Sequence, residues 1–513
     1  MIFPNDYDFV MGGRNRRLQK SIEERDQKLK EFAENPYMFS SSLDEALNTN
    51  HVTSQAEALA RMFARENVFI SGLAGSGKTT VVKRFIDHVE SEFDDFNIAV
   101  TASTGIAATI LGGQTIHSWA GLGISKAPFD PRNIESSVWG KYFIIEKTDI
   151  LIIDEISMLP AYLFIKLDKI LKYVKHNDKP FGGIQLVLVG DFLQLPPVPS
   201  KDADCRFAIE TEEWQEAHIS HCFLDQTRRT NDKKLEKILT DISSNTVDDE
   251  SRGYLESRMN LDDNSGKSFV NLYTTNKNVD KFNKEQLEKN PNPSMFFRAR
   301  HDFGDKANIE KLIRKNNIPE VVELKVGATV IVTKNFYYTN GEFIPNGSVG
   351  TVIGFKSDHG EPSAEVKLNN GKIIQLYKTR TEMTDKRIEY KEDKKIPYKV
   401  VVACVSQIPL KLGYATTVHK SQGQTYDGVV CDLSTCFQPG LGYVALSRVK
   451  SLDDLYIQGF SQKALKISEN ALKISQYIKK EALEARKEFI ENKDKYDELL
   501  TNPLQRELYW TKD

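Results

Sequence analysis

The sequence predicts an α/β protein built on parallel β-sheets, with a small antiparallel β module inserted in its second half. Two observations predict this fold class. From Val52 to Thr101, helical and strand patterns alternate, as they do in parallel sheets. After Gly327 the texture changes to short alternating strands separated by the turn signals Asn346-Gly347 and Asn370-Gly371. At 513 residues the chain is too long for one hydrophobic core, so we expect several domains.

The first strand leads into a glycine-rich loop. The apolar run that starts at Asn67 predicts a buried strand, and the loop after it, GLAGSGKTT, fits the pattern G-x-x-x-x-G-K-[ST]. Glycines let successive N–H groups face a phosphate chain, the lysine reaches the outer phosphates and the hydroxyl completes a Mg²⁺ shell. The sequence therefore predicts a site for a nucleoside triphosphate and Mg²⁺, formed by Gly72, Gly75, Ser76, Gly77, Lys78, Thr79 and Thr80.

Two further apolar strands end in polar groups. The run 149–153 leads into Asp154 and Glu155, a Walker B pattern in which the first carboxylate holds Mg²⁺ and the second orients and deprotonates the attacking water. The run 184–189 leads toward Gln194, whose amide is placed to bond both the γ-phosphate and that water; a simple proline-terminated loop is the alternative. An amphipathic helix is expected between the two strands, from about Ala161 to Lys175. Open α/β sheets bind ligands at the carboxyl ends of their strands.

The rest of the chain predicts a second α/β region from about Gln226. The antiparallel module interrupts it, and the charge-rich stretch 378–399 predicts a mobile loop or a hairpin arm. The α/β pattern resumes near Lys399 and ends near Phe460. Beyond Ser461 we expect helices packed on a lobe, with a partner-binding arm as the alternative.

Composition excludes several classes of protein. With 40% apolar and 27% charged residues the composition is that of an ordinary soluble protein. The chain contains neither a membrane-spanning apolar run nor a signal-peptide core, so we expect no membrane partner and no secretion. The five cysteines form no C-x-x-C pair, which favours reduced thiols in a cytoplasmic or nuclear compartment. Because the net charge is −3, any binding of a polyanion must come from a local basic groove.

Several long blocks together resemble a known family. The chain contains, in order, GLAGSGKTT, TASTGIAATILGGQTIHSWAGLG, IIDEISML, PFGGIQLVLVGDFLQLPPV, ATTVHKSQGQT and GYVALSRV. This series resembles the Pif-one family of superfamily 1 DNA helicases, relatives of RecD, from about His51 to Phe460. The resemblance implies two RecA-like lobes, with a small insertion in the first and an SH3-like β insertion in the second.

The resemblance also implies domain boundaries. We expect a variable N-terminal segment at 1–47, a first RecA-like lobe at 48–225 with a wedge-bearing insertion at about 120–145, a second RecA-like lobe at 226–325 and 400–460, an SH3-like insertion at 326–399, and a C-terminal helical segment at 461–513.

For the nucleotide site, the resemblance implies ATP with Mg²⁺. Gln55 falls where the family reads adenine, and an amide pairs with both adenine N6 and N7. Lys78, Thr79, Asp154, Glu155 and Gln194 keep the roles given above. Arg229 and Arg448 resemble two arginine fingers from the second lobe, a device worth roughly 10³ to 10⁵ in rate. The family usually has Arg-Gln where this chain has Arg229-Thr230, so Arg228 stays open as the acting residue.

The resemblance implies DNA contacts in both lobes. They are Thr104, Gly105, His117 and Trp119 in the first lobe, and Thr417, His419, Lys420, Ser421 and Gln422 in the second. Small hydroxyls and backbone N–H groups suit phosphates, and His117 and Trp119 suit stacking on bases. Taken singly, the histidines are also consistent with structural roles and Trp119 with a place in the core.

The sequence thus predicts an ATP-dependent DNA helicase that translocates on single-stranded DNA and unwinds forked duplex, as a monomeric motor. The resemblance implies 5′-to-3′ polarity, activity on RNA–DNA hybrids and G-quadruplexes, and a task in replication, recombination or repair. Two other classes of protein fit the sequence less well. A GTPase switch needs Asn-Lys-x-Asp, and the nearest string, which begins at Asn276, lacks the acid. A RecD-like binding subunit with an idle ATPase disagrees with the complete set of catalytic residues.

Overall fold

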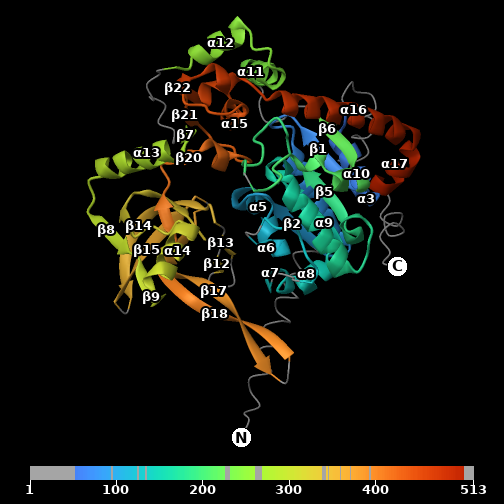
Figure 1. Cartoon of the computed structure of the whole chain (residues 1–513). Coiled ribbons are helices and arrows are strands. Elements are labelled where there is room, and N and C mark those ends of the chain that lie inside the picture. Colours follow the sequence, from blue (N-terminus) through green and yellow to red (C-terminus); the bar gives the residue numbers. More distant parts are fainter. Residues whose placement is uncertain are drawn as a thin grey trace. The chain divides into compact units, whose positions relative to one another are not determined.

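The fold is described from a computed structural model, which covers residues 52–93, 96–123, 126–132, 136–200, 202–225, 232–259, 269–334, 336–337, 343–344, 346–358, 360–369, 371–391 and 394–501 (Figure 1). The expected N-terminal segment, Arg228 and Arg229 lie outside these residues. The chain divides into two compact units, Met1–Tyr254 with Leu465–Asp513, and Leu255–Ala464. Among the described helices, none is long and apolar enough to cross a membrane. The five cysteines are free thiols, as predicted.

The first unit is organised around a six-stranded sheet with the order β3-β2-β4-β5-β1-β6. All its strand pairs are parallel. The bounds are β1 (Val68–Gly72), β2 (Ile98–Ala102), β3 (Gln114–Thr115), β4 (Ile150–Asp154), β5 (Gln185–Val189) and β6 (Ser220–Leu224). The central strands β1, β4 and β5 are buried along their whole length, which explains their continuous apolar runs.

Alternate side chains of these strands enter two cores, one on each face of the sheet. Phe69, Leu151 and Leu188 face a core that contains α9 (Ala161–Lys175), the helix expected at these residues. Ile70 and Ile152 face the opposite core, which contains α3 (Gln55–Phe63) and α4 (Lys78–Glu92). The remaining helices before β6 are α5 (Gly105–Ile110), α6 (Ile116–Ala120), α7 (Ser136–Trp139), α8 (Tyr142–Lys147) and α10 (Glu212–Glu216).

The C-terminal helices belong to this unit. Helix α16 (Glu469–Glu491) contacts the edge strand β6, and α17 (Lys493–Thr501) contacts α3. Ile474, Ile478 and Ala482 enter the first core, whereas Phe489 enters the second. Helix α16 therefore spans both cores along the edge strand, and the expectation of a packed helix is confirmed. The unit also contains α11 (Lys233–Ser244), and α12 (Asp249–Glu256) lies at its boundary.

The second unit contains a four-stranded parallel sheet with the order β20-β7-β21-β22. Its strands are β7 (Val270–Tyr273), β20 (Ala415–Thr417), β21 (Val429–Leu433) and β22 (Leu455–Phe460), and its helices include α13 (Asn276–Lys289) and α15 (Leu441–Leu446). The two parallel sheets, one in each unit, confirm the predicted fold class of two RecA-like lobes.

The predicted antiparallel module is a five-stranded sheet with the order β16-β15-β14-β11-β19. Its strands are β11 (Thr329–Val332), β14 (Val349–Asp358), β15 (Glu361–Leu368), β16 (Ile373–Leu376) and β19 (Leu410–Leu412). Strands β8 (Ser294–Arg298) and β10 (Val321–Lys325) form a pair, as do β12 (Phe336–Tyr337) and β13 (Phe343–Ile344). Of the two forms expected for 378–399, the hairpin is the one observed: β17 (Thr379–Lys391) pairs with β18 (Lys394–Gln407), which also pairs with β9 (Arg300–Gly304) beside α14 (Lys306–Asn316) (Figure 1).

Candidate functional site

The P-loop joins β1 to α4 and is shaped by its glycines. Gly72 has a φ of +144°, and a Cβ at this position would lie 2.2 Å from the carbonyl oxygen of Leu224 on β6. Gly77 caps α4 in the left-handed conformation, with a φ of 87°. The ammonium of Lys78 donates to the carbonyls of Gly72 (2.8 Å) and Leu73 (3.0 Å). Thr79 and Thr80 follow in the first turn of α4, whose amino end provides the partial positive charge that favours a phosphate.

Gln55 reaches the P-loop from the first turn of α3. That helix begins where Ser54 accepts a hydrogen bond from the Glu57 amide (3.0 Å), which fixes the position of Gln55. The side-chain Nε2 of Gln55 donates to the carbonyl of Ser76 (3.2 Å). Its Oε1 is buried and accepts no hydrogen bond from the residues that the structure describes. The amide nitrogen of Gln55 is therefore held by the P-loop, and its oxygen remains available to accept a hydrogen bond from a nucleotide base.

Asp154 and Glu155 end the central strand β4. Asp154 is 8% exposed and Glu155 is 7% exposed, and Glu155 has a left-handed φ of 54°. Burial and the neighbouring Glu155 raise the pKa of Asp154 to about 7, against the opposing charge of Lys78. The two buried carboxylates are electrostatically suited to a cation such as Mg²⁺. Ser103 was missed by the sequence reasoning: its amide donates to the Asp154 carbonyl (3.0 Å) and its hydroxyl to the Glu155 carbonyl (2.9 Å).

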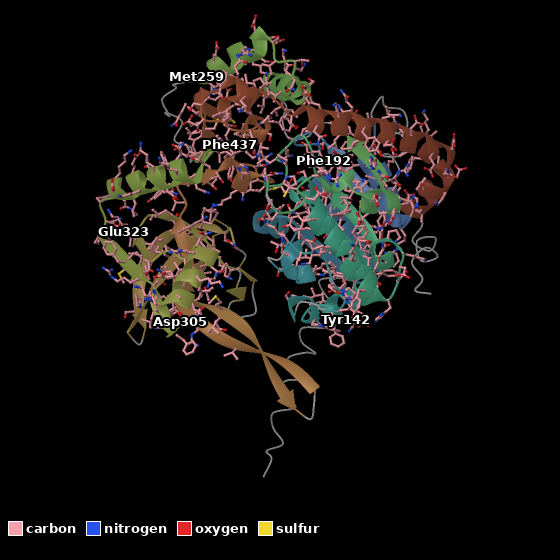
Figure 2. All side chains as sticks on the ribbon, viewed as in Figure 1. Tyr142, Phe192, Met259, Asp305, Glu323 and Phe437 are labelled. Atoms are coloured by element: carbon pink, nitrogen blue, oxygen red, sulfur yellow. The ribbon has the colours of Figure 1, made fainter. Side chains whose placement is uncertain are left out.

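The loop after β5 carries Asp191 and Gln194. Strand β5 pairs with both β4 and β1, so this loop emerges between the carboxylates and the P-loop. Phe192, labelled in Figure 2, anchors this loop. The centroid of its ring lies 5.5 Å from that of Phe69 on β1. The Gln194 Nε2 donates to the Asp191 carboxylate (3.2 Å), while its buried Oε1 has no hydrogen-bond partner among the described residues. Asp191 therefore holds the nitrogen end of the amide, and the oxygen end remains an available acceptor.

The residues fit Mg²⁺ in the way that it is held with nucleotides. Mg²⁺ usually takes one or two protein oxygens, waters and substrate phosphates. Thr79 and Asp154 supply such oxygens at neighbouring loops. In the described part of the chain, no cluster of three or more His, Cys, Asp or Glu side chains is placed to hold a metal ion without a ligand's help.

The predicted DNA residues of the first unit have different surroundings. Thr104 and Gly105 open α5, and the Thr104 hydroxyl accepts from the Ala107 amide (3.2 Å). On α6, His117 is exposed whereas Trp119 is only 2% exposed and packs in the core. Residues two apart on a helix point about 200° apart, so both side chains cannot face one strand. The expected stacking of Trp119 on a base is therefore corrected: its indole belongs to the core.

In the second unit, the segment after β20 carries the remaining predicted contacts. Lys420 is exposed and His419 is half-buried, with its ring stacked on Phe437 at 6.1 Å. Thr417, Ser421 and Gln422 are buried. The Thr417 hydroxyl accepts from the Lys420 amide (3.4 Å), and the Ser421 hydroxyl donates to the Val418 carbonyl (2.8 Å). These buried side chains shape the loop, and Lys420 is the side chain it presents most openly.

Arg448 is 2% exposed and lies within the second unit. Its guanidinium donates to the carbonyls of Val444 (2.8 Å), Ser421 (3.3 Å) and Gln424 (3.1 Å), and to the Ser447 hydroxyl (2.7 Å). It thereby ties α15 to the segment that carries Ser421 and Gln422. The sequence did not predict this second role for the arginine.

Comparisons with known proteins fall on the same elements. The family model described as PIF1-like helicase matches residues 49–248, and the one described as UvrD-like helicase C-terminal domain matches residues 412–452. The first match includes Gln55, Lys78, Glu155 and Gln194, and the second includes Lys420 and Arg448.

Curated relatives and solved structures agree. The chain is 34% identical over 465 residues to the ATP-dependent DNA helicase Pif1 of Psychrobacter sp., covering 80% of this chain and 69% of the relative. It is 31% identical to the protein of the same name from Bdellovibrio bacteriovorus, covering 80% and 88%. A crystal structure of the Pif1 helicase from Candida albicans superposes with a TM-score of 0.71 at 28% identity, covering 83% and 98%; Bacteroides Pif1 bound to ssDNA does so with 0.68 at 28%, covering 83% and 96%.

Proposed function

We propose how the site works from one premise: this chain belongs to the PIF1-like helicase family and is an ATP-dependent DNA helicase. The proposal is that it hydrolyses ATP to move 5′ to 3′ along single-stranded DNA and so separates a forked duplex. The observation that carries the hydrolysis is the buried Asp154–Glu155 pair at the strand end beside the P-loop, with the Gln194 amide emerging next to it. The polarity rests on the family resemblance alone.

For hydrolysis, we assign the P-loop amides and Lys78 to the phosphate chain and Gln55 to the adenine. Thr79 and Asp154 would hold Mg²⁺, which when bound neutralises charge on the phosphate oxygens. Glu155 accepts the proton of the attacking water. The Nε2 of Gln194 donates to the Asp191 carboxylate, so the Oε1 remains to accept a hydrogen bond from the attacking water. That hydrogen bond fixes the direction from which the water attacks.

Arg448 is proposed as an arginine finger that also reports on the nucleotide. To contact a γ-phosphate, its guanidinium must give up some of its bonds to the carbonyls of Ser421 and Gln424. Those carbonyls belong to the segment expected to contact DNA. Exchange of these bonds for a phosphate would therefore change the strand-contacting loop when ATP binds. Arg229, or Arg228 in its place, is proposed as the second finger on the resemblance alone.

The substrate is proposed as single-stranded and forked DNA. One solved relative, Bacteroides Pif1, is described bound to ssDNA. Another solved structure is described as the structural basis for DNA unwinding at forked dsDNA by two coordinating Pif1 helicases. The family resemblance further supports RNA–DNA hybrids and G-quadruplexes as substrates, a monomeric motor, and action in replication, recombination or repair. A DNA substrate places the protein in a DNA-containing compartment, cytoplasmic or nuclear.

Strand displacement on matched tailed duplexes tests the polarity. The same duplex is given a 5′ tail, a 3′ tail or no tail, with ATP and Mg²⁺ and excess trap strand. We expect displacement with the 5′ tail alone. Displacement with the 3′ tail alone would show that the polarity is wrong, while leaving the helicase activity intact. Lys78→Ala is the matched control, because loss of the phosphate-binding ammonium removes the energy source for every substrate.

A further inference from the structure

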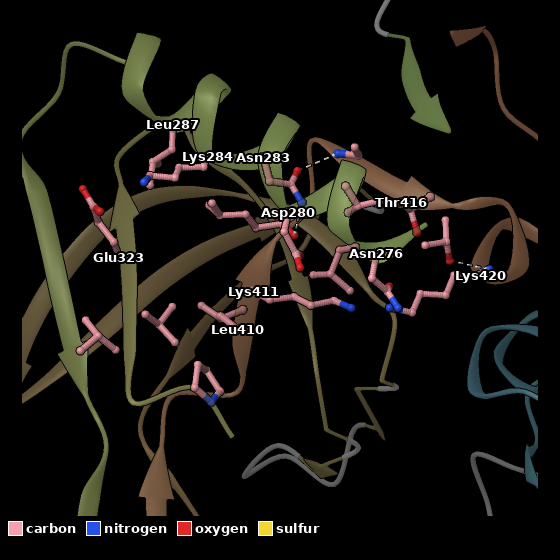
Figure 3. A pocket seen from close by; sticks show the side chains of 18 residues that line it. Asn276, Asp280, Asn283, Lys284, Leu287, Glu323, Leu410, Lys411, Thr416 and Lys420 are labelled. Atoms are coloured by element: carbon pink, nitrogen blue, oxygen red, sulfur yellow. Dashed lines mark hydrogen bonds between the residues drawn. The ribbon is translucent and has the colours of Figure 1, made fainter. Parts of the chain in front are cut away.

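A pocket of about 370 Å³ lies wholly inside the second unit, between α13 and the strands β10, β11, β19 and β20 (Figure 3). One wall is apolar and includes Val279, Leu287 and Leu412. At one end two lysines line it, Lys411 from the antiparallel sheet and Lys420 from the segment after β20. The volume is within the range of small-ligand sites, about 300–1,000 Å³.

The two lysines extend toward the same space (Figure 3). Among the described residues, neither ammonium forms an ion pair with a carboxylate. Burial and the neighbouring Lys420 lower the pKa of Lys411 to about 8, against the opposing charge of Asp280. Two neighbouring cations repel each other, and an anion bound between them would reduce that repulsion.

The position of Lys411 is fixed by the fold. It pairs with Ile331 in the register of β11 and β19, so the sheet fixes its backbone and the face from which its side chain leaves the strand. The backbone at Lys420 is held by the hydrogen bond from its amide to the Thr417 hydroxyl. One lysine thus comes from the antiparallel sheet and the other from the parallel one. An anion held by both would bridge the two parts of the unit.

We propose that Lys411 and Lys420 together bind one phosphate of the tracked DNA strand, which makes Lys411 a further strand-binding residue. The inference rests on the proposed function, since it takes the strand past Lys420. The apolar wall of the pocket limits access of water to the ammonium of Lys411, which strengthens a phosphate contact there. A free nucleotide carries the same chemistry, and the experiment below separates it from the strand.

Binding of the full chain to a fluorescently labelled oligo-dT, measured by anisotropy over a salt series, gives the first test. Lys411→Gln should weaken binding about tenfold at low salt. Because each phosphate contact contributes about 0.7 to the slope of log K against log salt on single strands, the slope should become shallower by that amount. Lys411→Arg keeps the charge and should bind like the parent chain.

Lys284→Gln is the matched control. Lys284 lines the other end of the same pocket and lies 4.0 Å from Glu288, so its removal should leave affinity and slope unchanged. Wild-type affinity and slope in Lys411→Gln, with normal binding by the parent chain, would overturn the inference and leave the proposed function standing. Failure of the parent chain to bind oligo-dT would overturn both.

Proton uptake supplies a readout that a purely structural role would not move. A phosphate stabilises the charged form of Lys411, so binding at pH 8 should take up about half a proton, measured by calorimetry in buffers of different ionisation enthalpy. The charged groups facing this site are Lys420, Asp280, Lys284 and Glu323. Lys411→Arg should lose the uptake while keeping affinity, since a guanidinium stays protonated. Equal proton uptake by the parent chain and by Lys411→Arg would contradict the inference.

The same calorimetry separates the two sources of phosphate. Thymidine monophosphate replaces oligo-dT as the titrant, with all other conditions unchanged. Uptake that depends on Lys411 with oligo-dT and is absent with the mononucleotide supports strand binding. Uptake that depends on Lys411 with the mononucleotide alone would overturn the inference, because the pocket would then bind a free nucleotide.

Discussion

At the scale of single residues, the two glutamines that we propose for the nucleotide site have the same arrangement. In each, the amide nitrogen is held by the protein, at the Ser76 carbonyl for Gln55 and at the Asp191 carboxylate for Gln194. In each, the oxygen is buried without a partner among the described residues. A buried acceptor left unpaired costs stability. Such a cost is tolerable where a ligand supplies the missing hydrogen bond.

This arrangement predicts the outcome of Gln55→Ala. Loss of the base contact should raise the KM for ATP about tenfold and reduce the preference for ATP over GTP. Steady-state hydrolysis with both nucleotides measures the two effects. Ser54→Ala weakens the start of the same helix without removing the amide, so it should lower stability and keep the preference. An unchanged ratio of kcat/KM for ATP and GTP in Gln55→Ala would exclude an adenine-reading role.

The raised pKa of Asp154 predicts a pH-dependent stability. Its folded pKa of about 7 exceeds the ordinary value of 3.8, so the folded state binds more protons than the unfolded state between these values. Stability from this group is therefore present at low pH and lost as the pH rises toward 7. Without nucleotide and with EDTA, Asp154→Asn should raise Tm at pH 8 by at least about 2 °C and have little effect at pH 4. An equal change in Tm at pH 4 and pH 8 would contradict this assignment. The Asp154→Asn variant should hydrolyse no ATP at either pH.

At the scale of elements, α16 covers the edge strand β6 and reaches both cores of the first unit. Ile478 is 1% exposed, whereas Leu483 on the same helix is 47% exposed. Ile478→Ala should lower the free energy of unfolding by about 2–5 kcal/mol. Leu483→Ala should change it by no more than about 0.5 kcal/mol.

Tryptophan fluorescence in urea measures both variants. Trp119, Trp139 and Trp214, three of the four tryptophans of the chain, are described residues of the first unit, so the signal follows its unfolding. Equal midpoints for the two variants would show that α16 does not stabilise this unit.

The local spacing of apolar and turn residues predicted most of the helices and strands, but few of the contacts between them. The helix expected at Ala161 to Lys175 has those bounds, because apolar spacing and flanking turn residues decide a helix locally. The packing of α16 against β6 joins segments far apart in sequence, and no local pattern encodes it. The same holds for Trp119, whose burial depends on α9 and the sheet, and for Arg448, whose partners lie in another loop.

At the scale of the whole molecule, each unit carries residues that we propose as parts of the motor. The first holds the P-loop, the carboxylates and Gln194, and the second holds Arg448 and the segment with Lys420. Residue types at strand ends predicted the first set, because the chemistry of phosphate and water restricts which side chains serve. The second set was predicted by resemblance, since single arginines and lysines have no distinctive pattern.

The central claim is that ATP hydrolysis at Lys78 and Glu155 is coupled to a DNA strand. The most direct measurement is the steady-state rate of ATP hydrolysis by the purified chain, with and without oligo-dT. We expect the strand to raise turnover several-fold, and Lys78→Ala to abolish both rates. Turnover that is no higher with the strand than without it would contradict the account.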